Sequence, residues 1–294
     1  MVNEKSKAEQ LILNMIFIIF CALILYPFLL VAAVSFTDEK TIINEGYKLI
    51  PSVFSLEAYK YVFRNPGSVI NAYKVTAIFS VATMIGSVVL QSCLAYAIAN
   101  KKLKGRMQIS FILYFTMLFS GGLVPTYILM TQYLHLDDTI WVYIIPALVS
   151  PWNVFMIRTQ FQALPDGLME AAKVDGASQY RTLFQIVMPL SKPVLATVAL
   201  TTFLGKWNDW MTSMLYINDE NLISLQYLLQ RIMQNIQMLQ NDSASAMGLM
   251  DYSDIPSETV RMAMAIVVAG PALLVFPFFQ KYFVKGLTVG SVKG

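Results

Sequence analysis

The chain has 294 residues, of which 56% are hydrophobic and only 13% are charged, and its formal net charge is +3. Soluble domains usually carry about 25% charged residues, so this composition argues against an ordinary soluble protein and favours a membrane protein. His135 is the only histidine, and the two cysteines, Cys21 and Cys93, lie in apolar runs without zinc-binding spacing, so we predict no metal site.

Long apolar segments dominate the chain from its first residues onward. A helix needs about 20 apolar residues to cross the bilayer, and open strand edges cannot be satisfied in lipid. We read the first segment as a retained span, because it is longer than the roughly 7–15 residues of a signal peptide core. We therefore predict an all-α, polytopic membrane protein with six transmembrane helices, at approximately residues 11–34, 70–99, 107–130, 139–158, 193–214 and 260–281.

The lysine and arginine residues predict the orientation. If the N-terminus lies inside, the inside segments hold 13 of these residues and the outside segments hold 5, while three lie in or beside spans. Positive residues favour the cytoplasmic side, so both termini are predicted to be cytoplasmic.

Two outside segments are long enough to form structure of their own. Residues 35–69 contain a short aromatic helix at about 55–63, and residues 215–259 contain an amphipathic helix from Leu222 to Leu239. The apolar face of this second helix either packs on the protein itself or docks a partner, and the pattern favours packing.

Several predicted spans contain residues that interrupt helices. Such breaks expose backbone carbonyls and provide hinges beside a transport pathway, although glycine and proline are also common in ordinary membrane helices. The interrupting residues are Gly121, Gly122, Pro125, Pro146, Pro151, Pro271 and Pro277.

The inside loop at residues 159–192 has a pattern of two short helices. Pro165 and Asp166 suit a helix start, and Gly176 stops that helix because glycine adopts the left-handed conformation at little cost. Ser178 is a plausible N-cap for a second helix. The result is a compact projection in which small alanine side chains allow another surface to approach closely.

This loop resembles the EAA loop of ATP-binding-cassette importer permeases. The family pattern is E-A-A, three residues, G, nine residues, I, one residue, L-P. Glu170-Ala171-Ala172, Gly176, Ile186 and Met188-Pro189 match it at every fixed position, except that Met188 replaces leucine and preserves its volume.

The resemblance implies that the first short helix is a coupling helix, which contacts a separate cytoplasmic ATPase. It also implies a single permease domain over residues 1–294, with a core at about 70–281, the loop 159–192 inside and the loop 215–259 outside. The contact would be made by Glu170, Ala171, Ala172, Asp175 and Gly176, with Ala177, Ile186 and Pro189.

Two further segments are similar to the smaller permease of maltose-type systems, in its oligosaccharide and polysaccharide-fragment branch. One is Lys206-Trp207-Asn208-Asp209-Trp210, and the other is the tail from Tyr282 to Gly294. By this resemblance the tail reaches the ATPases through Lys285, Gly286, Gly290, Lys293 and Gly294. The partners implied are a second permease, two ATPases and an extracytoplasmic solute-binding protein, in a bacterial cell membrane.

Several residues are candidates for a solute pathway. Aromatic rings can stack on sugars and amides can bind hydroxyl groups, but interfacial tryptophans are equally well explained by an aromatic belt. Lys206 and Asp209 share a helix face and are expected to pair. The candidates are Gly121, Gly122, Trp152, Asn153, Trp207, Asn208, Asp209 and Trp210.

The sequence lacks a phosphate-binding loop of the G-x-x-x-x-G-K-[S/T] type. ATP and magnesium are therefore expected on the partner ATPase, and no cofactor is expected in this chain. No nucleophile and base are clustered, so no enzymatic reaction is predicted, and the charge pattern implies no nucleic-acid binding. The alternatives are an ATP-binding-cassette permease for another solute, an ion-driven secondary transporter, and a membrane-embedded enzyme. A secondary transporter would need intramembrane carboxylates, and Asp209 is the only candidate for one.

Overall fold

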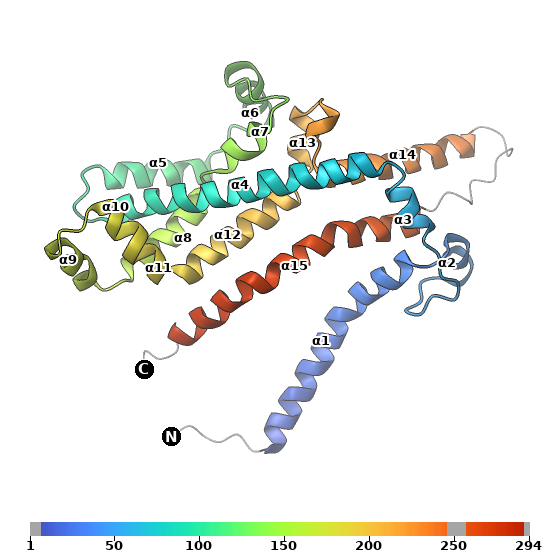
Figure 1. Cartoon of the computed structure of the whole chain (residues 1–294), viewed down its shortest axis with the longest axis horizontal. Coiled ribbons are helices and arrows are strands. Elements are labelled where there is room, and N and C mark those ends of the chain that lie inside the picture. Colours follow the sequence, from blue (N-terminus) through green and yellow to red (C-terminus); the bar gives the residue numbers. More distant parts are fainter. Residues whose placement is uncertain (1–6, 246–256, 291–294) are drawn as a thin grey trace. The chain divides into compact units, whose positions relative to one another are not determined.

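The computed structural model describes residues 7–245 and 257–290, and these residues are almost entirely helical (Figure 1). A single isolated β-bridge, between Thr37 and Phe54, is found in this part of the chain. The chain forms two compact units, one of residues 1–66 and 229–270 and the other of residues 67–228 and 271–294. The predicted all-α class is confirmed.

The first unit begins with α1 (Lys7–Ser35), a long apolar helix whose side chains are largely exposed up to Leu29. Because such a surface is unfavourable in water, its exposure fits contact with lipid or another apolar surface. The short helices α2 (Glu39–Glu45) and α3 (Glu57–Val62) follow, and α3 confirms the predicted short helix of the first outside segment.

Glu39, in the first turn of α2, is 8% exposed and ties this segment to the start of α15 (Glu258–Gly290). One carboxylate oxygen accepts hydrogen bonds from the backbone N–H groups of Ser257 and Glu258 and from the Ser257 hydroxyl, at 2.9–3.3 Å. The other accepts from the backbone N–H of Thr259 at 2.9 Å and from its hydroxyl at 2.6 Å. Glu39 therefore caps a helix more than two hundred residues away.

The helix α14 (Leu225–Ser245) confirms the amphipathic helix predicted in the second outside segment. Its apolar residues Leu225, Leu229 and Ile236 are buried, with exposed fractions of 4% or less. This burial favours packing on the protein itself over docking of a partner for that face. From the sequence, the polar residues Asn241, Asp242 and Ser243 suit a mobile tip of this outside segment, but their side chains lie outside the described part of the chain.

The second unit contains most of the predicted spans. Its helices and turns, in chain order, are α4 (Pro66–Ala99), α5 (Arg106–Leu118), α6 (Leu123–Ile128), the π-helical turn η1 (Leu129–Tyr133), α7 (Trp141–Ile144), the 3-10 turn η2 (Ile145–Ala147), α8 (Pro151–Gln162), α9 (Asp166–Val174), α10 (Gln179–Thr182), the π-helical turn η3 (Leu183–Val187), α11 (Met188–Leu190), α12 (Lys192–Trp207), α13 (Met211–Tyr216) and the 3-10 turn η4 (Glu220–Leu222).

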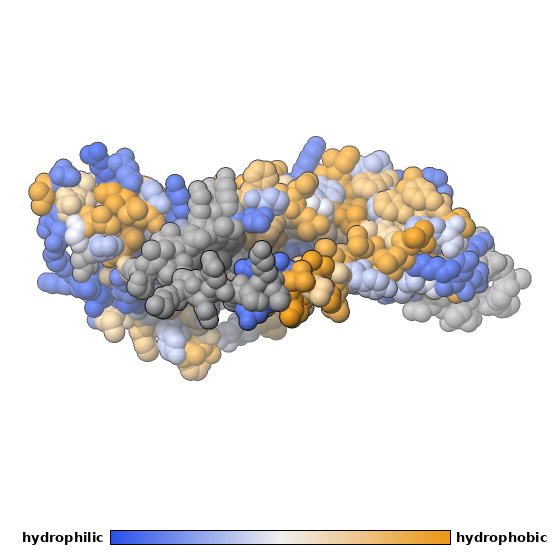
Figure 2. All heavy atoms as spheres, turned by 90° about the horizontal axis from the view of Figure 1, so that it is seen from below, coloured by the Kyte–Doolittle hydropathy of each residue, from blue (hydrophilic) through white to orange (hydrophobic). Residues whose placement is uncertain are grey.

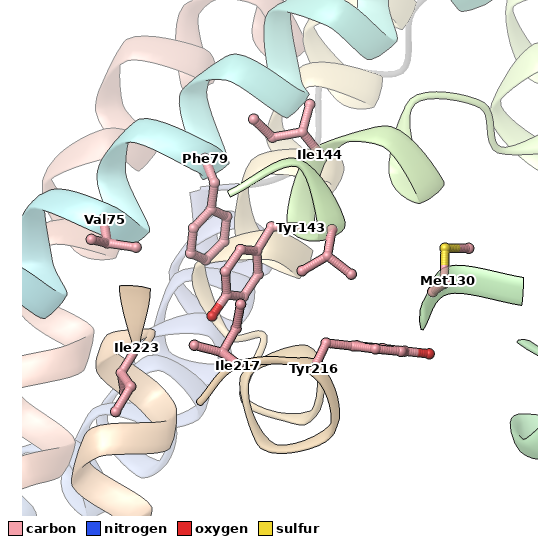
Figure 3. Close-up of a cluster of buried hydrophobic side chains, with 9 residues drawn as sticks. Val75, Phe79, Met130, Tyr143, Ile144, Tyr216, Ile217 and Ile223 are labelled. Carbon is pink, nitrogen blue, oxygen red and sulfur yellow. The ribbon is translucent and has the colours of Figure 1, made fainter. Parts of the chain in front are cut away.

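One buried cluster of the second unit lies where α4, α7 and the chain after α13 meet (Figure 3). The rings of Phe79 and Tyr143 are stacked with centroids 4.2 Å apart and an interplanar angle of 4°. The Tyr143 hydroxyl hydrogen-bonds the Ser213 hydroxyl and donates to the Leu222 carbonyl at 2.9 Å. A buried tyrosine needs such partners, and they fix the position of the loop that leads into α14.

A second buried cluster packs α4 against α8, η3 and α12. Its central members are fully or almost fully buried aliphatic residues, including Ile98, Val154, Ile157, Val187 and Val198. The buried face of α4 carries polar residues such as Thr76, Ser80 and Gln91 as well as apolar ones, and its exposed face carries apolar residues such as Ile78 and Ile85. The helix therefore shows almost no amphipathic pattern in its sequence.

Within the described residues 7–245 and 257–290, three helices are long and apolar enough to cross a membrane, at Glu9–Ser35, Pro66–Ala99 and Glu258–Gln280. Two bent pairs raise this number to five if each pair is one span, namely Arg106–Leu118 with Leu123–Tyr133, and Gln179–Leu190 with Lys192–Trp207. The structure thus supports a membrane protein with several apolar helices, while the exact number of six stays a prediction.

Three predicted spans are not single helices. The breaks at Gly121–Gly122 and at Pro146 and Pro151 were predicted, whereas the break within 193–214 was not. Conversely, α15 continues through Pro271 and Pro277, where we expected an interruption. The segment 107–130 is bent by 118° between α5 and α6, where Gly122 has a φ of +85°. The segment 139–158 is divided among α7, η2 and α8, because Pro146 and Pro151 remove backbone donors. The segment 193–214 stops at Trp207 and restarts at Met211.

Asp138 joins two loops of the second unit. Its carboxylate accepts hydrogen bonds from the backbone N–H groups of Asn218 and Asp219, the latter at 2.8 Å, and its own N–H donates to the Tyr216 carbonyl at 2.9 Å. These backbone donors, with that of Asp219 contributing most, hold the pKa of Asp138 below its ordinary value of 3.8.

We expect Asp138→Asn to reduce the loss of stability at acid pH. Since the folded-state pKa is lowered, the carboxylate stabilises the fold above the ordinary pKa, and this contribution is lost as the pH falls through the folded-state value. Thermal unfolding of the purified chain between roughly pH 6 and pH 2.5 measures the effect. An unchanged pH dependence in Asp138→Asn would contradict the assignment.

Candidate functional site

The predicted projection between residues 159 and 192 is present. Its first helix, α9, begins at Asp166 after Pro165, as predicted. Ala172 is 3% exposed and Met169 packs against the second buried cluster, so these two residues anchor the helix. Glu170 and Ala171 are exposed, and Val174 is 87% exposed at the end of the helix.

Gly176 ends α9 in the predicted way. Its φ is +71°, in the left-handed region that favours glycine. The N–H of Ala177 donates to the Ala172 carbonyl at 2.9 Å, and the N–H of Gly176 donates to the Lys173 carbonyl at 3.1 Å. This pair of bonds resembles a Schellman motif, which satisfies the last carbonyls of the helix. A side chain at Gly176 would project into open space.

The second part of the projection runs from Gln179 to Leu190 as α10, η3 and α11. The Ser178 hydroxyl accepts from the Arg181 N–H at 3.3 Å, which confirms the predicted N-cap. The Tyr96 hydroxyl donates to the Gln179 side chain at 2.9 Å and so ties this helix to α4. The π-helical turn η3 was not predicted from the sequence.

The matched residues of the projection differ in exposure. Glu170, Ala171, Asp175, Gly176 and Pro189 are exposed, Ala177 and Ile186 are half-buried, and Ala172 is buried. Leu183 and Val187, 3% and 0% exposed, hold the second part on the core. After this part the chain bends by 85° into α12. The arrangement presents a short helix and a glycine turn on a supported base.

The predicted tail contacts fall at the edge of the described structure. Lys285, Gly286 and Gly290 lie in the last turns of α15, and their side-chain environment is outside the described part of the chain. Lys293 and Gly294 also lie outside it. Contact of this tail with an ATPase therefore stays a prediction.

Trp207 is 4% exposed and packs inside the second unit. Its ring stacks with Phe203 at a centroid distance of 5.7 Å and lies 6.2 Å from the ring of Tyr73. A buried ring beside two others has little open surface for a sugar. The structure therefore favours packing for Trp207, and its part in a solute pathway stays a prediction.

Lys206 and Asp209 form the predicted ion pair, with Nζ and Oδ2 2.7 Å apart and side chains 17% and 12% exposed. Asp209 also accepts from the Thr212 N–H at 3.0 Å and from the Thr212 hydroxyl at 2.8 Å, which caps the first turn of α13. The Ser224 hydroxyl donates to the Asp209 carbonyl at 2.9 Å. These contacts assign Asp209 a structural role where α12 breaks.

The remaining pathway candidates lie on several elements and differ in exposure. Gly121 and Gly122 are exposed in the turn before α6, Trp152 is 68% exposed in the first turn of α8, and Asn208 is exposed at the end of α12. Asn153 and Trp210 are half-buried. Among the residues that the structure describes, no group of three or more metal-binding side chains occurs.

Figure 2 shows broad hydrophobic areas alternating with hydrophilic ones on the face that it displays. Together, long apolar helices, bent spans and an exposed helical projection with a glycine turn define a multi-pass transport subunit. The chain belongs to the family described as "Binding-protein-dependent transport system inner membrane component", which matches residues 3–289. The resemblance to importer permeases is thereby confirmed, as is the inner-membrane location of this family.

Characterised relatives align over almost the whole chain. The polygalacturonan/rhamnogalacturonan transport system permease protein YtcP of Bacillus subtilis is 37% identical over 99% of this chain and 100% of its own length. The trehalose/maltose transport system permease protein MalG of Thermococcus litoralis is 30% identical over 94% of each. A solved bacterial ABC transporter involved in import of the acidic polysaccharide alginate contains a chain with a TM-score of 0.78 and 26% identity, over 95% of this chain and 98% of that one.

Proposed function

We propose that this chain is a permease subunit of an ATP-binding-cassette importer for oligosaccharides. The observation that carries the proposal is its similarity, over nearly the full length, to carbohydrate transport permeases. The glycine-terminated projection at Glu170–Pro189 supports it, because this is the segment that resembles the family's ATPase contact. Membership of a binding-protein-dependent family disfavours the ion-driven alternative and gives no support for an enzyme.

The finer architecture forms part of the same proposal. Six spans with both termini in the cytoplasm agree with the distribution of lysine and arginine. A second permease completes the pathway, two ATPases bind ATP and magnesium, and an extracytoplasmic protein delivers the solute. Exposed apolar side chains on α5 and α6, such as Leu118 at 61% and Val124 at 63%, fit burial against a second permease or lipid.

Uptake measurements test the proposed function. Cells that carry the complete transport system should accumulate a labelled oligosaccharide, and deletion of this chain should abolish accumulation while binding to the extracytoplasmic protein continues. Fragments of acidic polysaccharides, such as oligogalacturonides, should be compared with neutral maltose-type and arabinan-type oligomers. Accumulation that persists without this chain, or that requires an ion gradient instead of ATP, would contradict the proposal.

We propose Asn208 as the pathway candidate to be tested for contact with solute. It is exposed, its side-chain oxygen accepts from Gln226 at 2.9 Å, and its amide donates to the Leu204 carbonyl at 2.9 Å. The residue is therefore held in one orientation at the end of α12, with surface available to a solute hydroxyl.

We expect Asn208→Ala to raise the KM for uptake several-fold, with a change in stability within about 0.5 kcal/mol, as for most exposed substitutions. Transport kinetics and thermal unfolding measure the two effects. Gln226→Ala removes the same side-chain hydrogen bond and is the matched control for loss of that contact. An unchanged KM for Asn208→Ala would remove this residue from the solute pathway.

A further inference from the structure

The turn between α4 and α5 is strongly cationic. Its four basic residues are Lys101, Lys102, Lys104 and Arg106. Between residues 91 and 165 the only acidic residues are Asp137 and Asp138, and Asp138 is held by Asn218 and Asp219. The sequence around this turn therefore carries a marked excess of positive charge.

Arg158 brings a fifth cation to the same end of α5. Its Nη1 donates to the Ser110 hydroxyl at 3.2 Å, and that hydroxyl donates to the Arg106 carbonyl at 2.8 Å. Ile109 of α5 packs on the buried cluster that contains Ile157 of α8, which keeps the two helices together. Arg158 thus lies within one turn of the start of α5.

The described residues satisfy only part of the Arg158 guanidinium group, through the bond from Nη1 to Ser110. Its Nε is buried and has no hydrogen-bond partner, and no ion pair joins it to a described carboxylate. A buried charged donor without an acceptor is costly. Arginine presents planar, forked donors that match phosphate oxygens. Arg158 as a whole is half-buried, so a phosphate would bind the part of the guanidinium group that is not enclosed.

The backbone at this place favours the same kind of ligand. The first turn of α5 starts after Gly105 and has no hydrogen bond from a capping side chain. The first N–H groups of a helix have no partner within the helix, and they attract phosphate. Ser110 links Arg158 to the first turn of α5, so the guanidinium group and the uncapped helix start belong to one site.

Apolar side chains lie directly beside these cations. Met107 and Phe111 are each 65% exposed, Ile112 is 61% exposed, and no residue of α5 is buried. A free phosphate would use the cations and leave this apolar wall bare. A phospholipid would place its phosphate on the cations and its acyl chains along α5.

We propose that the α4–α5 turn and Arg158 bind the phosphate headgroup of an anionic phospholipid. Arg158 binds the phosphate, the lysines of the turn supply additional attraction, and the outer face of α5 holds the acyl chains. In the proposed orientation of the chain, this lipid belongs to the cytoplasmic leaflet. The inference depends on membrane insertion and is independent of the identity of the transported solute.

Native mass spectrometry of the full chain, purified with the subunits that accompany it, tests the proposal. Phosphatidylglycerol and phosphatidylcholine with identical acyl chains are titrated separately. The wild type should retain phosphatidylglycerol about tenfold more strongly, because phosphatidylcholine carries the same phosphate together with a choline cation that the basic residues of the turn repel. Arg158→Gln should lower this retention to the level of phosphatidylcholine, and Arg158→Lys should recover part of it.

Lys48→Gln and Lys60→Gln are the matched controls, because both residues are exposed and paired with Glu45 and Glu57 in the first unit. They should leave retention unchanged.

Equal retention of the two lipids by the wild type would overturn the proposal. No change in Arg158→Gln, with normal elution and thermal unfolding, would also overturn it. Displacement of the lipid by millimolar inorganic phosphate would identify a free-phosphate site and overturn the proposal. Loss of lipid retention when the ATPase binds would show that the basic residues contact the ATPase, and it would overturn the proposal as well. Uptake is not the readout, so failure here is distinguishable from failure of the proposed transport function.

Discussion

Replacement of Gly176 by arginine is expected to reduce uptake to the level of cells that lack the chain, while membrane insertion remains intact. Gly176 has a φ of +71°, and a residue with a side chain costs about 1–2 kcal/mol in this conformation. The new side chain would project from an exposed turn into open space, so it would disturb a docking partner more than the chain itself. Radiolabelled solute uptake and ATP hydrolysis by the assembled system measure the loss of coupling.

Gly46→Arg is the matched control for this variant. Gly46 also has a positive φ, of +76°, and no atom lies within 4 Å of the position of an added Cβ, but it lies in the first outside segment. It should reduce uptake far less than Gly176→Arg. Gly176→Ala, which strains the backbone without bulk or charge, should have an intermediate effect. Normal uptake by Gly176→Arg would contradict the assignment of this turn to an ATPase contact.

Glu39→Ala is expected to lower the free energy of unfolding by about 2–4 kcal/mol, since removal of one charged partner leaves several buried donors unsatisfied. The carboxylate accepts five hydrogen bonds from Ser257, Glu258 and Thr259, and two of them come from the buried Thr259. The variant should also weaken the first turn of α15, which is one of the apolar helices long enough to cross a membrane. Thermal unfolding in detergent and the yield of inserted protein measure the effect.

Glu57→Ala is the control for removal of a glutamate from the same unit. Glu57 pairs with Lys60 at 2.7 Å, but the two side chains are 64% and 70% exposed, and such pairs contribute about 1 kcal/mol or less. Glu39→Gln should be intermediate, because its single oxygen can replace only one of the two carboxylate oxygens. Equal stability of Glu39→Ala and Glu57→Ala would show that Glu39 does not cap α15 in the membrane-embedded protein.

Local patterns predicted the helical class and the projection well. Pro165, Gly176 and Ser178 act within a few residues of their own positions, so their roles follow from sequence rules for helix ends. The interrupted spans were predicted at Gly121–Gly122 and Pro151, but not the 118° bend. A bend angle depends on what the two halves pack against, and the sequence does not contain that information.

Long-range contacts explain what the sequence did not reveal. Glu39 was not singled out, because its partners lie more than two hundred residues away in sequence. Trp207 was a candidate for sugar binding, because tryptophan side chains serve both in binding and in packing. Its contacts with Phe203 and Tyr73 favour packing, and the sequence alone does not reveal these contacts. The Lys206–Asp209 pair was predictable because both residues lie on one helical turn.

Cysteine cross-linking at Val174 tests most directly whether the Glu170–Pro189 projection contacts a separate ATPase. Cys21 and Cys93 are first replaced by alanine, and Val174→Cys is compared with Met238→Cys; the two native side chains are 87% and 62% exposed. In an active, assembled importer we expect a short bifunctional reagent to join position 174 to the ATPase, with a yield that changes on ATP addition, and position 238 to give no such product. Cross-linking of the ATPase to position 238 but not to position 174 would contradict the account.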